Sequence, residues 1–192
     1  MSHTPINIFG FSASPRLQGS TAWAVNTLLK GAQLQGAHIF FKSAAQLDLR
    51  PCQACFACRS NGRHCVINDD MPSLHAAILQ AQCLVLGLPI FMGQMSAQAK
   101  IFLDRLHPLF APRFSPTFEP QNAGKKLLLA FVQGNPDPAL FRTYIDYTEQ
   151  LFRTLEFDVQ QSLIITGTRS HNAKEQKDLQ THLQTIGASL CP

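Results

Sequence analysis

The sequence predicts a doubly wound, three-layer α/β sandwich around a five-stranded parallel sheet in the order 2-1-3-4-5. Short apolar runs alternate with segments of helical periodicity along the 192 residues, which is the pattern of repeated βαβ units. Two runs, at 83–89 and 125–132, are apolar without alternation, as in parallel strands that are covered on both faces. Right-handed crossovers then place the first and third strands on either side of the point where the strand order reverses.

Each element follows from its local pattern. Asp69 or Asp70 is a suitable N-cap for the second helix. A stripe of Phe141, Ile145, Thr148 and Phe152 marks one face of the fourth helix. The segment 108–120 carries four prolines, and we interpret it as an ordered excursion. We expect strands at 6–11, 37–42, 83–89, 125–132 and 159–166, and helices at about 20–34, 71–81, 96–110, 140–155 and 172–187.

Composition and charge exclude several classes of function. Charged residues make up 15% of the chain, and the net charge of +4 is scattered without a run of Lys or Arg, so we expect no nucleic-acid partner. No apolar stretch approaches the ~20 residues of a membrane span, and the N-terminus lacks the pattern of a signal peptide. We therefore expect a cytoplasmic protein whose cysteines stay reduced. The low charge also hints at surface hidden in an oligomer.

The stretch between the first strand and the first helix predicts an anion site. The N–H groups of a first helical turn attract anions, hydroxyl groups add donors, and an arginine can bond two phosphate oxygens. Neither G-x-x-x-x-G-K-[ST] nor G-x-G-x-x-G occurs, so a terminal monoester phosphate fits best. The alternative is an ordinary loop in which Ser20 caps the helix. The candidate phosphate-binding residues are Ser12, Ser14, Arg16, Gly19, Ser20 and Thr21.

The loop after the third strand is unusually apolar for a surface turn. A flat aromatic ligand would cover its side chains, and the backbone N–H groups near its glycine would bond the ring edges. The alternative, which is compatible with the first, is a loop buried in a contact between subunits. The loop that closes the fourth strand lies at the same edge of the sheet. The candidate ring-binding residues are Pro89, Ile90, Phe91, Met92 and Gly93 in the first loop, and Gln133, Gly134 and Asn135 in the second.

Four cysteines form the most specific pattern in the chain: Cys52, Cys55, Cys58 and Cys65 lie within fourteen residues. Such a cluster is hard to ascribe to core packing. The first three have the C-x2-C-x2-C spacing of bacterial ferredoxins, but the fourth spacing differs. Three states remain open, namely an iron–sulfur cluster, free thiols, and a zinc site with His64 as a further ligand. We name the four cysteines as candidate metal ligands.

Two loops resemble those of the flavodoxin-like NADPH-dependent FMN reductase and multimeric flavodoxin families. Residues 14–16 and 19–21 match the family's S-P-R-x-x-[GS]-[NS]-T loop, with Ala13 where a glycine is usual. Residues 89–93 match P-[IV]-[YF]-[FWM]-[GS], and 96–105 match S-x-x-x-K-x-[FL]-x-D-R. Within the last pattern Lys100 and Asp104 are spaced to pair across one helical turn. We expect structural roles for them and for Arg105, and we name no catalytic residue.

The cysteine segment resembles the compact motif of iron–sulfur flavoproteins, which are built on the same fold and bind a [4Fe–4S] cluster. Related reductases carry P-C-x-x-C-x-x-C…C-[VI]-x-x-D-D-M segments with no demonstrated cluster, and residues 51–71 match these equally well. The resemblance therefore leaves open whether the cysteines bind a cluster or are free thiols.

The resemblance implies one flavodoxin-like FMN-binding domain over residues 1–192, with a cysteine-rich insertion at about 51–68. It implies an FMN-dependent NAD(P)H oxidoreductase that passes electrons to a small-molecule acceptor such as a quinone, a flavin or a metal ion, or to an iron–sulfur centre. It also implies a homodimer or homotetramer. One alternative is an electron carrier in which FMN and a [4Fe–4S] cluster serve protein partners, although carriers usually dock through strongly charged faces. Another is a zinc-bound interaction module with an empty phosphate loop.

Overall fold

The fold was analysed in a computed structural model that describes residues 5–59, 64–110, 124–170 and 172–191. Most of the expected excursion at 108–120 therefore lies outside the described residues. Among the helices within these ranges, none is both long enough and apolar enough to cross a membrane.

The parallel sheet has the predicted strand order. It consists of β1 (Asn7–Ser12), β2 (His38–Ser43), β3 (Cys83–Phe91), β5 (Lys126–Val132) and β6 (Asp158–Ile165). The order is β2-β1-β3-β5-β6, and all four pairings are parallel. Among the described residues, the sequence interpretation missed one strand, β4 (Gln94–Met95), which pairs antiparallel with the end of β3.

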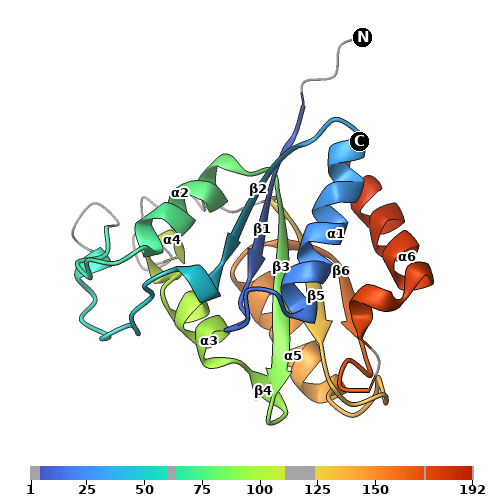
Figure 1. The fold of residues 1–192 in the computed structure, drawn as a ribbon. Coiled ribbons are helices and arrows are strands. Elements are labelled where there is room, and N and C mark those ends of the chain that lie inside the picture. Colours follow the sequence, from blue (N-terminus) through green and yellow to red (C-terminus); the bar gives the residue numbers. More distant parts are fainter. Residues whose placement is uncertain (1–4, 60–63, 111–123, 171, 192) are drawn as a thin grey trace.

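Helices cover both faces of this sheet (Figure 1). Residues of α1 (Ser20–Leu34) and α6 (Lys177–Ala188) pack with one core cluster, whereas residues of α2 (Met71–Gln80), α3 (Ala97–Asp104), α4 (His107–Phe110) and α5 (Arg142–Thr154) lie on the side of the other. The central strand β3 contributes Leu84 and Leu86 to one cluster and Val85 to the other. The absence of alternation in its sequence is thus explained, because both faces of the strand are buried.

Glycine allows α1 and α6 to pack backbone against backbone. A Cβ atom added at Gly31 of α1 would collide with the carbonyl oxygen of Gln184 and lie 2.8 Å from its carbonyl carbon. A Cβ atom added at Gly187 of α6 would collide in the same way with the carbonyl of Leu28. Each helix therefore presents a surface without side chain at the crossing.

Two helices differ in extent from the sequence expectation, and the capping of a third differs in detail. The single helix expected over 96–110 is wrong, because it is divided into α3 and α4. Pro108 has no N–H to bond the carbonyl of Asp104, and its ring crowds that carbonyl, so α3 ends there. The last helix begins at Lys177, after a 3₁₀ turn at Ala173–Glu175. At the start of α2 the N-cap residue Asp70 makes no capping bond, and Asp69 instead accepts from the amide of Met71.

The β3–β4 hairpin turns on two residues with positive φ, Met92 (50°) and Gly93 (77°). Two positive φ angles match the right-handed twist of the flanking strands, but a methionine there is strained. We expect Met92→Gly to raise the free energy of unfolding by about 0.5–1 kcal/mol, and Gly93→Ala to lower it by about 1 kcal/mol. Urea denaturation measures both values. Shifts of the same sign in the two variants would contradict this explanation.

Candidate functional site

The loops after β1 and β3 are joined at the carboxyl edge of the sheet. The amide of Ala13 donates to the carbonyl of Gly87 at 2.9 Å, and the Ser96 hydroxyl donates to the carbonyl of Ala13 at 2.7 Å. Ser96 also accepts from the amide of Ala99 and so caps α3. Figure 1 shows the start of α1 and the β3–β4 hairpin at this same end of the sheet. The structure therefore brings the two loops together, as the strand order predicts.

The first turn of α1 is free of side-chain caps. Gly19 occupies the N-cap position without a side-chain bond, and the first turn contains no acidic residue. Ser20 is the first residue of the helix, so the alternative in which Ser20 is the cap is wrong. Ser14 is buried, and its hydroxyl accepts from the amide of Arg16 at 3.1 Å, which shapes the loop. The uncapped N–H groups are what an anion at this position requires.

Gly87 of β3 allows the start of α1 to lie close to this strand. A Cβ atom added at Gly87 would lie 2.7 Å from Cγ2 of Thr21 and 2.6 Å from Cγ2 of Val25. Thr21 is itself buried. A glycine within an apolar strand was the signal for this close approach, and the sequence interpretation did not use it.

Two buried polar atoms at this edge have no hydrogen-bond partner within the described residues, Ser12 Oγ and Gln133 Oε1. Ser12 ends β1 opposite Gly87, and Gln133 directly follows β5. The Gln133 side-chain amide is held by bonds from Nε2 to the carbonyls of Asn135 (3.1 Å) and Asp137 (2.6 Å). A buried polar group without a partner is costly. A polar ligand that bonds the Ser12 hydroxyl and the Gln133 side-chain carbonyl would therefore stabilise this edge of the sheet. These residues fit the phosphate and the hydroxylated chain of FMN.

The first candidate ring-binding loop presents apolar side chains to solvent. Ile90 is buried, whereas Phe91 is 42% exposed and Met92 is fully exposed. In the second candidate loop, a Cβ atom added at Gly134 would lie 3.4 Å from Cβ of Arg169, so Arg169 lies close to this loop. Arg169 was missed in the sequence, because no local motif surrounds it. It adds a second arginine, with Arg16, to this edge of the sheet.

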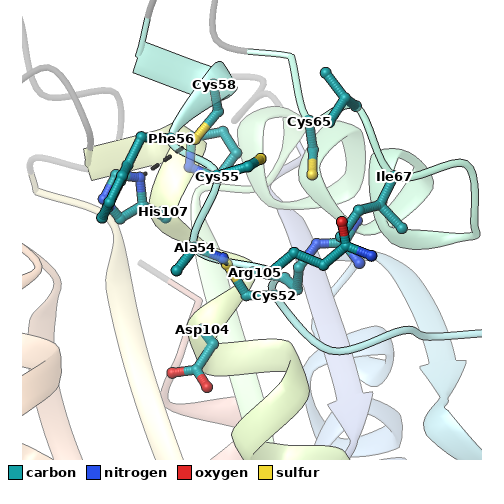
Figure 2. Close-up of a pocket in the computed structure, with 13 residues that line it drawn as sticks. Cys52, Ala54, Cys55, Phe56, Cys58, Cys65, Ile67, Asp104, Arg105 and His107 are labelled. Carbon is teal, nitrogen blue, oxygen red and sulfur yellow. Dashed lines mark hydrogen bonds between the residues drawn. The ribbon is translucent and has the colours of Figure 1, made fainter.

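All four candidate metal ligands line one cavity of about 300 Å³, together with Arg105 and His107 (Figure 2). Cys58 Sγ lies 3.3 Å from Nδ1 of His107, whose ring lies 5.8 Å from that of Phe56. Burial, followed by the charges of the neighbouring cysteines, raises the pKa of the Cys58 thiol.

The four thiols that line this cavity are a donor set that suits either an iron–sulfur cluster or a zinc site. Among the described residues, no three Cys, His, Asp or Glu side chains are grouped closely enough to hold a single metal ion. A zinc site needs four ligands at about 2.0–2.3 Å from one centre, whereas an iron–sulfur cluster bridges thiolates that are farther apart.

A buried ion pair lies beneath the cysteines. Arg105 donates to both oxygens of Asp69, at 2.6 and 2.9 Å, and the side chains are 1% and 0% exposed. The expected pair of Lys100 and Asp104 is also present at 2.6 Å, but it is exposed. The sequence interpretation foresaw the structural role of Arg105 without its partner, because 36 residues separate the two.

Comparisons with known proteins find similar sequences. The model of a family described as NADPH-dependent FMN reductase matches residues 6–192. The iron–sulfur flavoprotein MJ1083 of Methanocaldococcus jannaschii is 35% identical over 104 residues, which are 54% of this chain and 53% of that protein. The iron–sulfur flavoprotein of Methanosarcina thermophila is 31% identical over 100 residues, 52% of each chain. The chain thus matches about half the length of these curated relatives.

Solved structures show the same fold. The NAD(P)H:quinone oxidoreductase from Methanothermobacter marburgensis superposes with a TM-score of 0.75 and 13% identity, covering 97% of this chain and 98% of that one. The apo form of the NADH:FMN oxidoreductase EMOB gives a TM-score of 0.66 and 21% identity, covering 96% and 87% of the two chains.

Proposed function

This chain belongs to the NADPH-dependent FMN reductase family, and from that premise we propose that it is an FMN-dependent enzyme that oxidises NAD(P)H and reduces a small-molecule acceptor such as a quinone, a flavin or a metal ion. The observation that carries the proposal is the pairing of an uncapped helix N-terminus with the orphaned hydroxyl of Ser12 at the same edge of the sheet. An anionic, polar ligand satisfies both.

In this proposal the residues of the first loop hold the phosphate. The amides of the first turn of α1 donate to it, with the hydroxyls of Ser20 and Thr21, while Arg16 reaches it from solvent. The buried hydroxyl of Ser14 keeps the loop in shape by accepting from the amide of Arg16. Gly19 keeps the N-cap position free of a side chain.

The ring would lie against residues 89–93, with Gln133, Gly134 and Asn135 along its edge. When bound, FMN supplies the chemistry of hydride acceptance and electron release, and the protein orients it. The exposed Phe91 and Met92 also support a homodimer or homotetramer, since a partner subunit would cover what the ring leaves exposed. The four cysteines outside any disulfide support a reducing compartment such as the cytoplasm.

Comparison of FMN with riboflavin tests the phosphate site, because the two differ only in the phosphate. We expect Arg16→Ala to weaken FMN binding about tenfold, the loss of one exposed charge-assisted hydrogen bond, and to leave riboflavin binding unchanged. Quenching of flavin fluorescence measures both dissociation constants. Lys30→Ala removes an exposed charge farther along α1 and serves as the matched control. Equal losses for FMN and riboflavin would contradict a phosphate contact.

A second candidate function is that of an iron–sulfur flavoprotein that carries electrons between protein partners. The convergence of four cysteines on one cavity favours it, as do the names of the relatives. Anaerobic reconstitution with iron and sulfide tests it. About four irons per chain with a broad brown absorption would support a cluster, whereas flavin bands alone would indicate that the cysteines are free thiols. Bleaching of the flavin by NADPH without a partner protein would favour the enzyme over the carrier.

A further inference from the structure

We propose that Arg105 is a positioning residue for the cysteine cavity, with two roles. Its side chain ties together both ends of the cysteine segment, and its guanidinium offers the cavity a buried cationic N–H donor. The second role rests on the iron–sulfur candidate of the preceding subsection, whereas the first stands without it.

The two ends of the segment meet at Arg105. The segment 51–68 begins after Arg50 and ends before Asp69, and the amide of Arg50 donates to Asp69 Oδ2 at 2.9 Å. The Arg105 Nη1 atom donates both to that carboxylate oxygen (2.6 Å) and to the carbonyl of Arg50 (2.7 Å). One side chain from the end of α3 thus bonds the residue on each side of the segment.

A further pair of hydrogen bonds joins the residues that flank the cysteine segment, between Asp48 and Asp70. The amide of Asp48 donates to Asp70 Oδ2 at 2.8 Å, and the amide of Asp70 donates to the carbonyl of Asp48 at 3.0 Å. His75 fixes the backbone of Arg105, because its Nε2 lies 2.7 Å from the Arg105 carbonyl. The arginine is therefore held at both its side chain and its backbone.

Three of the five N–H groups of the guanidinium make the bonds described above, and the N–H of Nε is a further donor. Both Nη atoms of Arg105 bond Asp69, while Nε is buried and has no partner within the described residues. Arg105 also lines the cavity that the four cysteines line (Figure 2). A buried donor without a partner is costly, so a sulfur acceptor at this position stabilises the structure.

The charge of Arg105 acts on the same cavity. A guanidinium stays protonated in proteins, and Arg105 and Cys65 line the same cavity. The guanidinium is thus cationic beside Cys65. A cluster held by four thiolates is negatively charged and gains a further electron on reduction. A cationic donor nearby stabilises the reduced form and raises the reduction potential.

The experiment compares four proteins after anaerobic reconstitution with iron and sulfide. The double variant Arg105→Met/Asp69→Asn removes both charges and leaves no orphaned carboxylate, and Arg105→Lys keeps the charge but loses the second anchoring bond. Arg142→Met/Asp146→Asn removes an exposed pair on α5, 2.7 Å apart, and is the matched control beside wild type. The readouts are iron per chain, the midpoint potential of the cluster in a redox titration, and amide hydrogen exchange of residues 48–59 in the metal-free protein.

In the double variant we expect at least a twofold loss of iron, a more negative midpoint potential for the cluster that remains, and at least tenfold faster exchange at residues 48–59. Arg105→Lys should recover part of the potential but not the slow exchange. Wild-type exchange in the double variant would overturn the role in closing the segment, and a wild-type potential would overturn the role of the cationic donor. If the wild-type chain binds no iron, the iron–sulfur candidate fails, and the exchange rates alone decide the closing role.

Discussion

Asp69→Asn is expected to lower the free energy of unfolding by about 3–5 kcal/mol at pH 7, because it leaves the buried Arg105 guanidinium without its counter-charge. Burial would raise the pKa of Asp69, but the hydrogen bonds from Arg105, from the amide of Arg50 and from the amide of Met71 lower it below the ordinary 3.8. A depressed carboxyl pKa stabilises the folded state above the unfolded-state pKa. That contribution is lost as the pH falls through the folded-state value.

The gap between wild type and Asp69→Asn should therefore be full at pH 7 and shrink as the pH falls below about 4. Urea denaturation at pH 7, 5 and 3 measures it. Asp146→Asn removes the carboxylate of an exposed i,i+4 pair and should cost no more than about 0.5 kcal/mol at pH 7. A gap between wild type and Asp69→Asn that stays constant down to pH 3 would show that the carboxylate charge is not the cause.

Gly31→Ala should lower the free energy of unfolding by about 2–3 kcal/mol, although alanine is the better helix former by about 1 kcal/mol. The added methyl group would meet the backbone of Gln184, which has no rotamer with which to move aside. The helices α1 and α6 must then separate, and the core between them and the sheet loosens. Thermal and urea denaturation would measure the loss.

Two further variants make this test specific. Lys30→Ala changes the exposed neighbour of Gly31 and should leave stability within about 0.5 kcal/mol of wild type. The double variant Gly31→Ala/Gly187→Ala should lose less than the sum of the two single losses, because one separation of the helices accommodates both methyl groups. Additive losses would mean that the two glycines relieve unrelated contacts.

The sheet could be predicted because its signals are local. The unbroken apolar run at 83–89 predicts a strand covered on both faces. The change from apolar to hydroxylated residues after Phe11 predicts the loop at the start of α1. The order of five strands then follows from the handedness of the crossovers. Placement of both candidate ligand loops at one edge required no further information.

The missed features depend on residues that are distant in sequence or act through backbone geometry. Asp69 and Arg105 meet across 36 residues, and neither one's surroundings in the sequence name the other. The hairpin at Met92 was missed because a methionine rarely adopts positive φ. The break between α3 and α4 is different, since Pro108 was visible in the sequence and the helical pattern was extended through it.

The hydrogen bonds that join residues 48 and 50 to residues 69 and 70 bring the two ends of the cysteine segment together. The chain leaves and re-enters the domain at nearly the same point, so replacing 51–68 by a short turn would leave every strand of the sheet in register. Residues 51–68 are thus expected to tolerate replacement without any change to the loops at the carboxyl edge of the sheet.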